Sequence, residues 1–296
     1  MMKNFIRINT SDNVVVALNE IIKGTILDDS EVNKILEDIK PGHKIATRDI
    51  NKGENILKYG YPIGHATENI KKGQWVHTHN IRTNLDGTLE YNYNPNFKDI
   101  RRINKPKTFM GYKRKNGDVG IRNELLVVPT VGCINGIAEM IVREFKNKIN
   151  LENIDDCLVY KHNYGCSQLG DDLENTRKIL ADIVKHPNAG GVLVLGLGCE
   201  NNVIDEFKKE LGEFDNDRTK FLITQTVSNE IEEGVKILEE LYETMKNDIR
   251  VEIPISELKI GLKCGGSDGF SGITANPLLG EFSDYIVDNG GITILT

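Results

Sequence analysis

Four of the five cysteines occupy the same kind of position, directly after an apolar run that predicts a β-strand. They are Cys133, Cys166, Cys199 and Cys264, which follow the runs 125–131, 158–160, 192–198 and 258–262. The carboxyl ends of parallel strands meet at one sheet edge, where open α/β sheets bind their ligands. A small cysteine can also pack there as a plain hydrophobic side chain. Four at one edge, each beside glycine or a polar residue, favour a shared site.

A glycine-rich loop contains the last of these cysteines. Between Lys263 and Asn276 the chain has four glycines and several polar side chains, among them Ser267 and Asp268. Asn276 and Pro277 then open a helix, with asparagine as the N-cap and proline in the first turn. Because glycine lets a backbone wrap closely around a small polar group, we expect this loop to bind a ligand.

Histidines form a second group of reactive side chains. His77 and His79 follow the strand-like residues 74–76, and positions i and i+2 of a strand share one face. Two imidazoles on one face could chelate a metal or contact a substrate, or the face could simply be polar and exposed. His43 lies in a Gly-His-Lys turn; it either reaches a site or remains solvated.

Arg122 and Asn123 precede the first strand of the α/β pattern. A guanidinium binds a carboxylate through two parallel hydrogen bonds, so Arg122 is a candidate substrate clamp; the alternative is a surface arginine paired with Glu124. The glycine-rich loops 196–202 and 265–269 could hold a phosphate or carboxylate on backbone N–H groups. Neither contains a nucleotide-binding fingerprint, which makes a nucleotide-binding module the weaker interpretation.

Composition limits the class of protein and its partners. The chain has 296 residues, 39% of them apolar, and a formal net charge of −7. Without a long basic run, nucleic acid and anionic membranes are poor candidates as partners. No stretch is apolar for 18 residues and the start lacks a signal-peptide core, so we expect a cytoplasmic protein with reduced thiols.

The pattern of the chain predicts two domains. Residues 1–95 predict a small β domain with short strands and a weak repeat, 49–56 resembling 68–76, although a turn of helix at 30–39 is conceivable. Residues 96–108 are polar and predict a linker. Residues 109–296 alternate between strands and helices, which predicts a parallel, doubly wound α/β domain.

The end of the chain is an apolar strand, residues 292–296, with no turn after it. A buried parallel strand is an unusual natural end, so we expect a fragment. Its exposed edge should promote self-association and its activity should be low. Whether the protein is a homo-oligomer is left open.

Several motifs together resemble one family. They are Gly-Asp-Val-Gly-Ile-Arg-Asn-Glu-Leu (117–125), Pro-Thr-Val-Gly-Cys-Ile-Asn-Gly-Ile-Ala (129–138), Tyr-Gly-Cys-Ser-Gln-Leu-Gly-Asp-Asp (164–172), the run 186–202 and Cys-Gly-Gly-Ser-Asp-Gly-Phe-Ser-Gly (264–272). They resemble the altronate/galactarate dehydratase family, and residues 42–44, 58–60, 62–64 and 77–80 resemble its small SAF (β-clip) domain. Family members are substantially longer than this chain.

The resemblance implies a hydro-lyase that converts D-altronate to 2-dehydro-3-deoxy-D-gluconate with iron(II) or manganese(II). A divalent ion on the carboxylate would act as a Lewis acid while a base removes the C2 proton and an acid protonates the leaving 3-hydroxyl. We expect the small domain to contribute its histidines to this site. The candidate acids and bases are His43, His77, His79 and Lys263. The candidate metal ligands are Cys133, His162, Cys166, Cys199 and Cys264, and the candidate substrate ligands are Arg122, Asn123, Ser267 and Asp268.

Other functions remain open at this stage. The same family resemblance would fit a galactarate dehydratase or a sulfolactate sulfo-lyase. A nucleotide-binding module should bind NAD or ATP, and a non-catalytic fragment should fold without turnover. The partner we expect is a small-molecule sugar acid.

Overall fold

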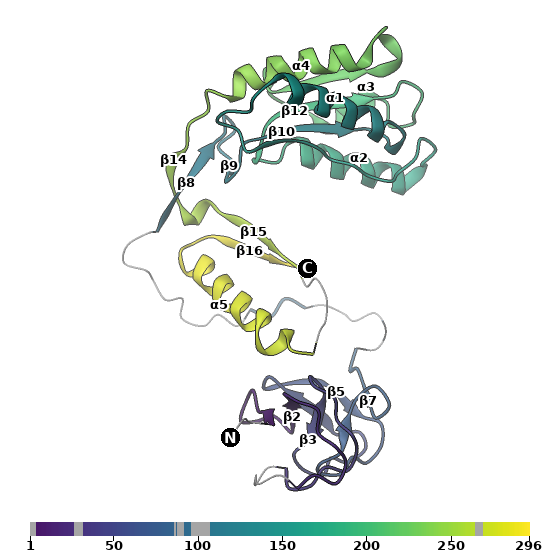
Figure 1. Cartoon of the computed structure of the whole chain (residues 1–296), viewed down its shortest axis with the longest axis vertical. Helices are drawn as coiled ribbons and strands as arrows, with labels where there is room; N and C mark the ends of the chain where they lie inside the picture. Colours follow the sequence, from purple (N-terminus) through teal and green to yellow (C-terminus); the bar gives the residue numbers. More distant parts are fainter. Residues whose placement is uncertain (1–3, 27–31, 86, 88–91, 96–106, 264–268) are drawn as a thin grey trace. The chain divides into compact units, whose positions relative to one another are not determined.

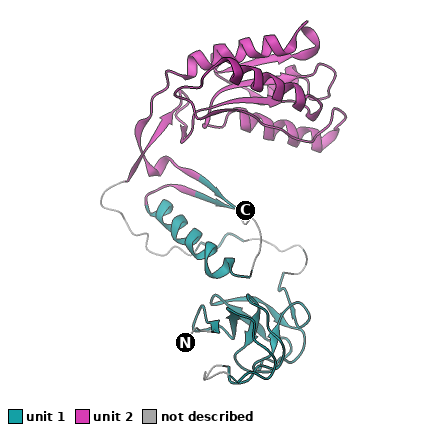
Figure 2. Cartoon of the chain, viewed as in Figure 1, with its two compact units in different colours: residues 1–102, 260–288, 293–296 teal, residues 103–259, 289–292 magenta. Residues whose placement is uncertain are grey.

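A computed structural model describes residues 4–26, 32–85, 87, 92–95, 107–263 and 269–296. The chain forms two compact units (Figure 2). The first unit comprises residues 1–102, 260–288 and 293–296, and the second comprises 103–259 and 289–292. This division differs from the predicted one in the place of residues 260–288, and most of the predicted linker 96–108 lies outside the described residues.

The N-terminal β region, residues 4–85, contains two small antiparallel sheets. One has the order β1 (Phe5–Ile6), β2 (Val14–Ala17), β3 (Lys44–Ala46) and β6 (Trp75–Val76). The other has the order β4 (Asn55–Lys58), β5 (Tyr61–Ala66) and β7 (Ile81–Arg82). Isoleucines and valines from both sheets fill two buried clusters. Residues 32–39 are extended, with bridges at Lys34 and Ile39, so the helical turn considered for 30–39 is absent from its described part.

The sequence repeat is also a structural repeat. Ile50 and Ile70 exchange backbone hydrogen bonds of 2.8 Å in both directions. In each copy the glycine of the Lys-Gly turn donates its N–H to an alanine carbonyl, Gly53 to Ala66 and Gly73 to Ala46. Both glycines have positive φ, 83° and 84°, a conformation that glycine adopts without strain.

The second unit is built on a four-stranded parallel sheet. Its order is β11 (Asp156–Val159), β10 (Glu124–Pro129), β12 (Ala189–Gly196) and β13 (Thr219–Ile223). The residues of β12 are buried almost throughout, as expected for a central strand covered on both faces. The sequence-based prediction of a parallel, doubly wound α/β sheet is therefore confirmed.

Helices cover both faces of this sheet (Figure 1). Helices α1 (Asn135–Lys148) and α4 (Glu230–Met245) pack with one buried cluster, and α2 (Gly170–Val184) and α3 (Ile204–Leu211) pack with another. Helix α4 begins at an Asn229 side chain that accepts the N–H of Glu232 at 3.1 Å, a standard N-cap. A Cβ atom at Gly234 would meet Ile141, so glycine allows α1 and α4 to approach closely.

Three short antiparallel strands, β8 (Thr108–Lys113), β9 (Val119–Gly120) and β14 (Val251–Pro254), form a separate sheet in the order β14-β8-β9. The last strands, β15 (Lys259–Leu262) and β16 (Ile292–Leu295), pair with each other, and α5 (Ala275–Asp288) connects them. The strand before Cys264 therefore does not belong to the four-stranded sheet, and the prediction of one shared sheet edge is wrong for it. Residue periodicity predicts strands but not which strands pair.

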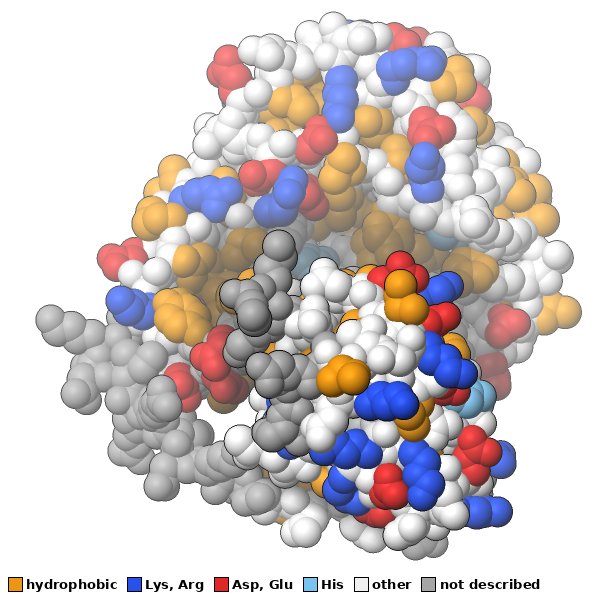
Figure 3. Space-filling view, turned by 60° about the horizontal axis from the view of Figure 1, so that its bottom comes forward, with side chains coloured by type: hydrophobic (Ala, Val, Ile, Leu, Met, Phe, Trp, Pro, Cys, Tyr) orange, Lys and Arg blue, Asp and Glu red, His pale blue; other side chains and the backbone are white. Residues whose placement is uncertain are grey.

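No helix within the described ranges is both long enough and apolar enough to cross a membrane. On the face shown in Figure 3, acidic and basic side chains are interspersed.

Candidate active-site groups

The carboxyl edge of the parallel sheet has the topology of a ligand site. The loop after β10 leads to α1 on one face, whereas the loop after β12 leads to α3 on the other face. Adjacent strands whose connections leave in opposite directions create a crevice, the usual binding place in open α/β sheets. A cavity of about 320 Å³ lies beside this edge and is lined in part by Gly198, Glu200 and Gln225.

Glu200 is the central polar group of this edge, with only 3% of its surface exposed. Its Oε1 accepts the Thr130 hydroxyl at 2.7 Å and the Leu197 N–H at 3.0 Å, and its Oε2 accepts the Gly198 N–H at 2.6 Å. Burial alone would raise the pKa of Glu200, but these hydrogen bonds favour the carboxylate and hold the pKa below its ordinary value. A buried negative charge thus joins the ends of β10 and β12.

Replacing Glu200 with glutamine should lower the free energy of unfolding by about 2–3 kcal/mol, because an amide N–H₂ would face donors instead of accepting from them. Since the folded-state pKa lies below the ordinary 4.5, the carboxylate stabilises the fold above about pH 4.5. This stabilisation is lost as the pH falls through the lower folded value. Thermal unfolding at several pH values measures both effects. The same change at exposed Glu210 is the control, and equal stability of the two variants would contradict the assignment.

Three of the predicted thiols lie in the loops at this edge and are exposed. Cys133 follows β10, Cys166 follows β11 and Cys199 follows β12. The Cys199 sulfur accepts a hydrogen bond from the Gln225 amide at 3.6 Å, and the Cys166 carbonyl accepts the Asn201 N–H at 3.2 Å. The fifth cysteine, Cys157, is buried in the core, and burial raises the pKa of its thiol to about 12.

His162 supports the loop after β11 through both ring nitrogens. Its Nε2 lies 3.0 Å from the Pro129 carbonyl oxygen and its Nδ1 lies 3.3 Å from the Tyr164 N–H. The carbonyl only accepts and the N–H only donates, so the ring proton is on Nε2. Binding a metal through His162 would require one of these bonds to break.

The described residues do not assemble the predicted metal site. Within them, no group of three or more histidine, cysteine, aspartate or glutamate side chains is placed to hold a metal ion. Cys264, Ser267 and Asp268 lie outside the described residues. The metal ligands therefore stay a prediction, as do the roles of Ser267 and Asp268 in substrate binding.

Arg122 and Asn123 lie at the opposite, amino edge of the sheet, just before β10. The Arg122 Nε pairs with Glu124 at 2.6 Å. The Asn123 side chain is completely buried, accepts from Arg114 at 3.1 Å and donates to the Met245 carbonyl at 3.3 Å. Through these contacts Arg122 and Asn123 stabilise the amino edge of the sheet. Their role in substrate binding stays a prediction.

A larger cavity, about 780 Å³, also lies at the amino edge. The Arg114 and Arg218 side chains that line it both pair with Asp248. Arg114 also donates to the Pro187 and Arg122 carbonyls. The arginines therefore hold the loops of this edge together.

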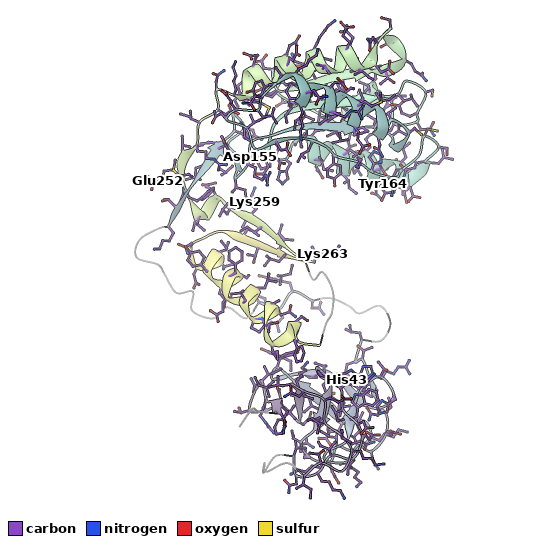
Figure 4. All side chains as sticks on the ribbon, viewed as in Figure 1. His43, Asp155, Tyr164, Glu252, Lys259 and Lys263 are labelled. Carbon is purple, nitrogen blue, oxygen red and sulfur yellow. The ribbon has the colours of Figure 1, made fainter. Side chains whose placement is uncertain are left out.

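The N-terminal β region gathers three histidines around the only tryptophan of the chain. The ring centroid of Trp75 lies 5.3 Å from that of His43, 5.2 Å from His77 and 4.9 Å from His79. His43 and His77 stack at 5.1 Å with an interplanar angle of 19°. The Trp75 indole N–H donates to His43 Nδ1 at 2.9 Å. Figure 4 labels His43 within this region.

The surroundings of the cluster favour the neutral form of His43 and His77. Burial lowers the pKa of His43, and the nearby charges of His77, Lys44 and Lys40 lower it further. Burial, Lys44 and His79 likewise lower the pKa of His77. The pKa of Lys44 is itself lowered by burial and by Lys58. The rings of His43 and His77 are therefore uncharged near neutral pH.

Asn80 gives the histidine loop its shape and is fully buried. Its side chain accepts the His77 N–H at 3.0 Å and donates to the Trp75 carbonyl at 2.8 Å. The sequence motif contained Asn80, but only the structure reveals this role. Lys263, labelled in Figure 4, is exposed at the end of β15; its catalytic role stays a prediction.

Replacing Asn80 with alanine should reduce the free energy of unfolding of the N-terminal β region by about 2–4 kcal/mol, because two buried backbone groups lose their partners. Urea unfolding followed by Trp75 fluorescence measures this change directly. Asn84→Ala, at an exposed position of the same region, should stay within about 0.5 kcal/mol of the parent. If Asn80→Ala were as stable as Asn84→Ala, the proposed role of Asn80 in shaping the histidine loop would be contradicted.

The two units and their groups define a class: a small β region carrying histidines, and a doubly wound α/β unit with three cysteine-bearing loops at its carboxyl edge. Family models match the chain in order. Residues 3–84 match the altronate/galactarate dehydratase SAF domain, 111–246 match the second domain of D-galactarate dehydratase/altronate hydrolase, and 255–296 match the C-terminal domain of D-galactarate/altronate dehydratase. The chain belongs to the altronate/galactarate dehydratase family, as its motifs had indicated.

Relatives of known name agree with this assignment. The chain is 54% identical to altronate dehydratase of Bacillus subtilis (strain 168) over 297 residues, which cover 100% of this chain and 60% of the relative. It is 51% identical to altronate dehydratase of Escherichia coli (strain K12), over 99% of this chain and 59% of the relative. Galactarate dehydratase (L-threo-forming) of E. coli is 28% identical over 99% of this chain and 58% of its own length. The chain thus spans about 60% of the length of these relatives.

Proposed function

We propose that the protein is a hydro-lyase that removes water from D-altronate and forms 2-dehydro-3-deoxy-D-gluconate, acting in the cytoplasm. The observation that carries the proposal is the cluster of three histidines around Trp75, in which the pKa values of His43 and His77 are lowered, in a chain about half identical to two altronate dehydratases. A dehydratase needs a base and an acid that work near neutral pH, which histidine supplies.

The proposed reaction breaks two bonds of the substrate. A neutral imidazole takes the proton from C2, next to the carboxylate, and the electron pair of that bond forms a C2–C3 double bond. The 3-hydroxyl leaves with a proton and becomes water. The resulting enol then loses the proton of its 2-hydroxyl, gains a proton at C3 and becomes the 2-keto acid. His77 and His79 are the proposed proton-transfer groups, because their rings face the Trp75 cluster.

We retain iron(II) or manganese(II) as the proposed cofactor, with Cys133, Cys166, Cys199 and Cys264 as the ligands to test. Thiolates suit iron(II), whereas oxygen ligands suit manganese(II). Because the described residues do not gather a metal site, no step of the proposed reaction is assigned to the ion. Metal analysis of anaerobically purified parent and Cys→Ser variants measures this part separately.

The test is an anaerobic assay of the longest natural form of the protein that contains these 296 residues. D-altronate and galactarate are supplied with iron(II), with manganese(II) or with a chelator, and the 2-keto acid product is identified. We expect turnover of altronate in preference to galactarate, and loss of turnover with the chelator. Preference for galactarate would change the substrate, and absence of turnover with both sugar acids would reject the proposed function.

A further inference from the structure

The hydrogen bond between Trp75 and His43 fixes the position of one proton. An indole N–H can only donate, so His43 Nδ1, 2.9 Å from Trp75 Nε1, must accept with its lone pair. A neutral imidazole carries a single ring proton, which must then be on Nε2. Within the described part of the chain, no group forms a hydrogen bond with this Nε2, and His43 is half-buried.

The same contact opposes a second proton on His43. Imidazolium would direct Nδ1–H at the indole N–H, placing two donors against each other. The charged neighbours act in the same direction, because Lys40, Lys44 and His77 all disfavour a further positive charge. The carboxylate of Glu37 accepts the backbone N–H of Trp75 at 2.9 Å. This hydrogen bond is made to the Trp75 backbone and not to the His43 ring, so it does not stabilise a positive charge on His43.

We propose that Trp75 is a positioning residue that holds His43 as a neutral imidazole with its proton on Nε2, and that His43 binds substrate oxygen as a hydrogen-bond donor without transferring a proton. A neutral imidazole that gave up its proton would become an imidazolate, which is far too basic to form near neutral pH. Its Nε2 cannot accept either, because it already carries hydrogen. The catalytic part of this inference rests on the proposed function, whereas the protonation state does not.

Proton transfer then falls to the other two rings of the cluster. His77 Nδ1 lies 2.9 Å from the Thr78 hydroxyl, which can either donate or accept, so its tautomer is not fixed. This freedom lets His77 exchange a proton, whereas the bond to Trp75 removes that freedom from His43. Sequence alone had treated all three histidines as equivalent candidates.

The protonation state can be measured in the 296-residue chain without any substrate. Trp75 is the only tryptophan, so a ¹⁵N–¹H correlation spectrum has one indole cross-peak, and long-range ¹⁵N spectra of labelled histidine report the His43 tautomer. We expect the Nε2–H tautomer at pH 7 to 8, with the His43 signal assigned through His43→Gln. Trp75→Phe keeps an aromatic ring but no donor, and should produce a mixture of tautomers and easier protonation of His43. A mixed or protonated His43 in the parent, or identical His43 spectra in Trp75→Phe, would overturn the proposal.

The catalytic role is tested with paired substitutions in the longest natural form. Glutamine presents an N–H donor near the place of Nε2 but cannot exchange a proton. His43→Gln should therefore keep kcat close to that of the parent, whereas His43→Ala should lose about tenfold, the scale of one neutral hydrogen bond. His77→Gln should be as impaired as His77→Ala. Equal loss in His43→Gln and His43→Ala would assign proton transfer to His43 and overturn its role. If no sugar acid is turned over, the proposed function and the catalytic role of His43 are rejected together, while the tautomer result stands.

Discussion

Replacing His77 with alanine should lower kcat for altronate about 100-fold or more, the usual consequence of removing a proton-transfer group. The ring of His77 stacks on His43 and lies against Trp75, and its lowered pKa keeps it available as a base. KM should change less than kcat, because the effect is on a chemical step. Steady-state kinetics with altronate, combined with metal analysis, make the measurement, and metal content should remain unchanged.

His65 provides a matched control in the same β region. It lies in β5, and its ring nitrogen contacts Asn84 at 2.8 Å, outside the Trp75 cluster. His65→Ala should leave kcat close to that of the parent. Parental turnover in His77→Ala would remove this residue from the chemistry, and a loss of metal in that variant would indicate a different role.

The second large effect concerns self-association of the 296-residue chain. Helix α5 exposes Leu278 and Phe282, at 71% and 40%, while β16 exposes Ile294 and Leu295, at 54% and 73%. Apolar side chains gathered on adjoining elements favour contact with another molecule, and a two-stranded sheet leaves strand edges open to pairing. We therefore expect oligomers whose mass rises with concentration in size-exclusion light scattering.

Charged substitutions test which surface associates. Leu278→Glu combined with Ile294→Lys should return the chain to a monomer, because burying either charge in a contact is costly. Glu281→Arg, on an exposed position of α5, should leave the association unchanged. A parent chain that is monomeric at all concentrations would contradict this prediction.

The sequence predicted the parallel α/β sheet well because strand and helix periods differ and alternate regularly from residue 124 onward. The sequence also predicted correctly that three cysteines follow adjacent strands. The strands of the first three β-α units are parallel neighbours in the sheet, so their carboxyl ends lie at the same edge. The sequence did not separate β15 from this sheet. Lys259–Leu262 has the composition of a parallel strand, and its actual partner, β16, depends on long-range packing that periodicity does not contain.

The candidate groups were harder to predict than the elements. Nothing in the sequence indicated that Glu200 is the central polar group of the sheet edge, because it lies within a glycine-rich run. Its role comes from its burial and from the Thr130 hydroxyl, a donor 70 residues away in the sequence. Trp75 looked like an ordinary strand residue until the structure placed His43, 32 positions earlier, against its N–H. Arg122 had the right chemistry for a carboxylate, but its position before β10 directs it to Glu124. Residue type suggests chemistry, whereas neighbours in space decide it.

The structural repeat of the N-terminal β region separates its backbone architecture from its reactive side chains. A shift of 20 residues brings Trp75 onto Asn55, His77 onto Leu57 and His79 onto Tyr59. Both copies make the same backbone bonds through Gly53 and Gly73, yet only the second carries the imidazoles. The first copy thus demonstrates that this scaffold does not depend on the reactive side chains. Substitution of His77 or His79 should therefore leave the backbone of this repeat intact, so the imidazoles can be varied separately from the architecture that holds them.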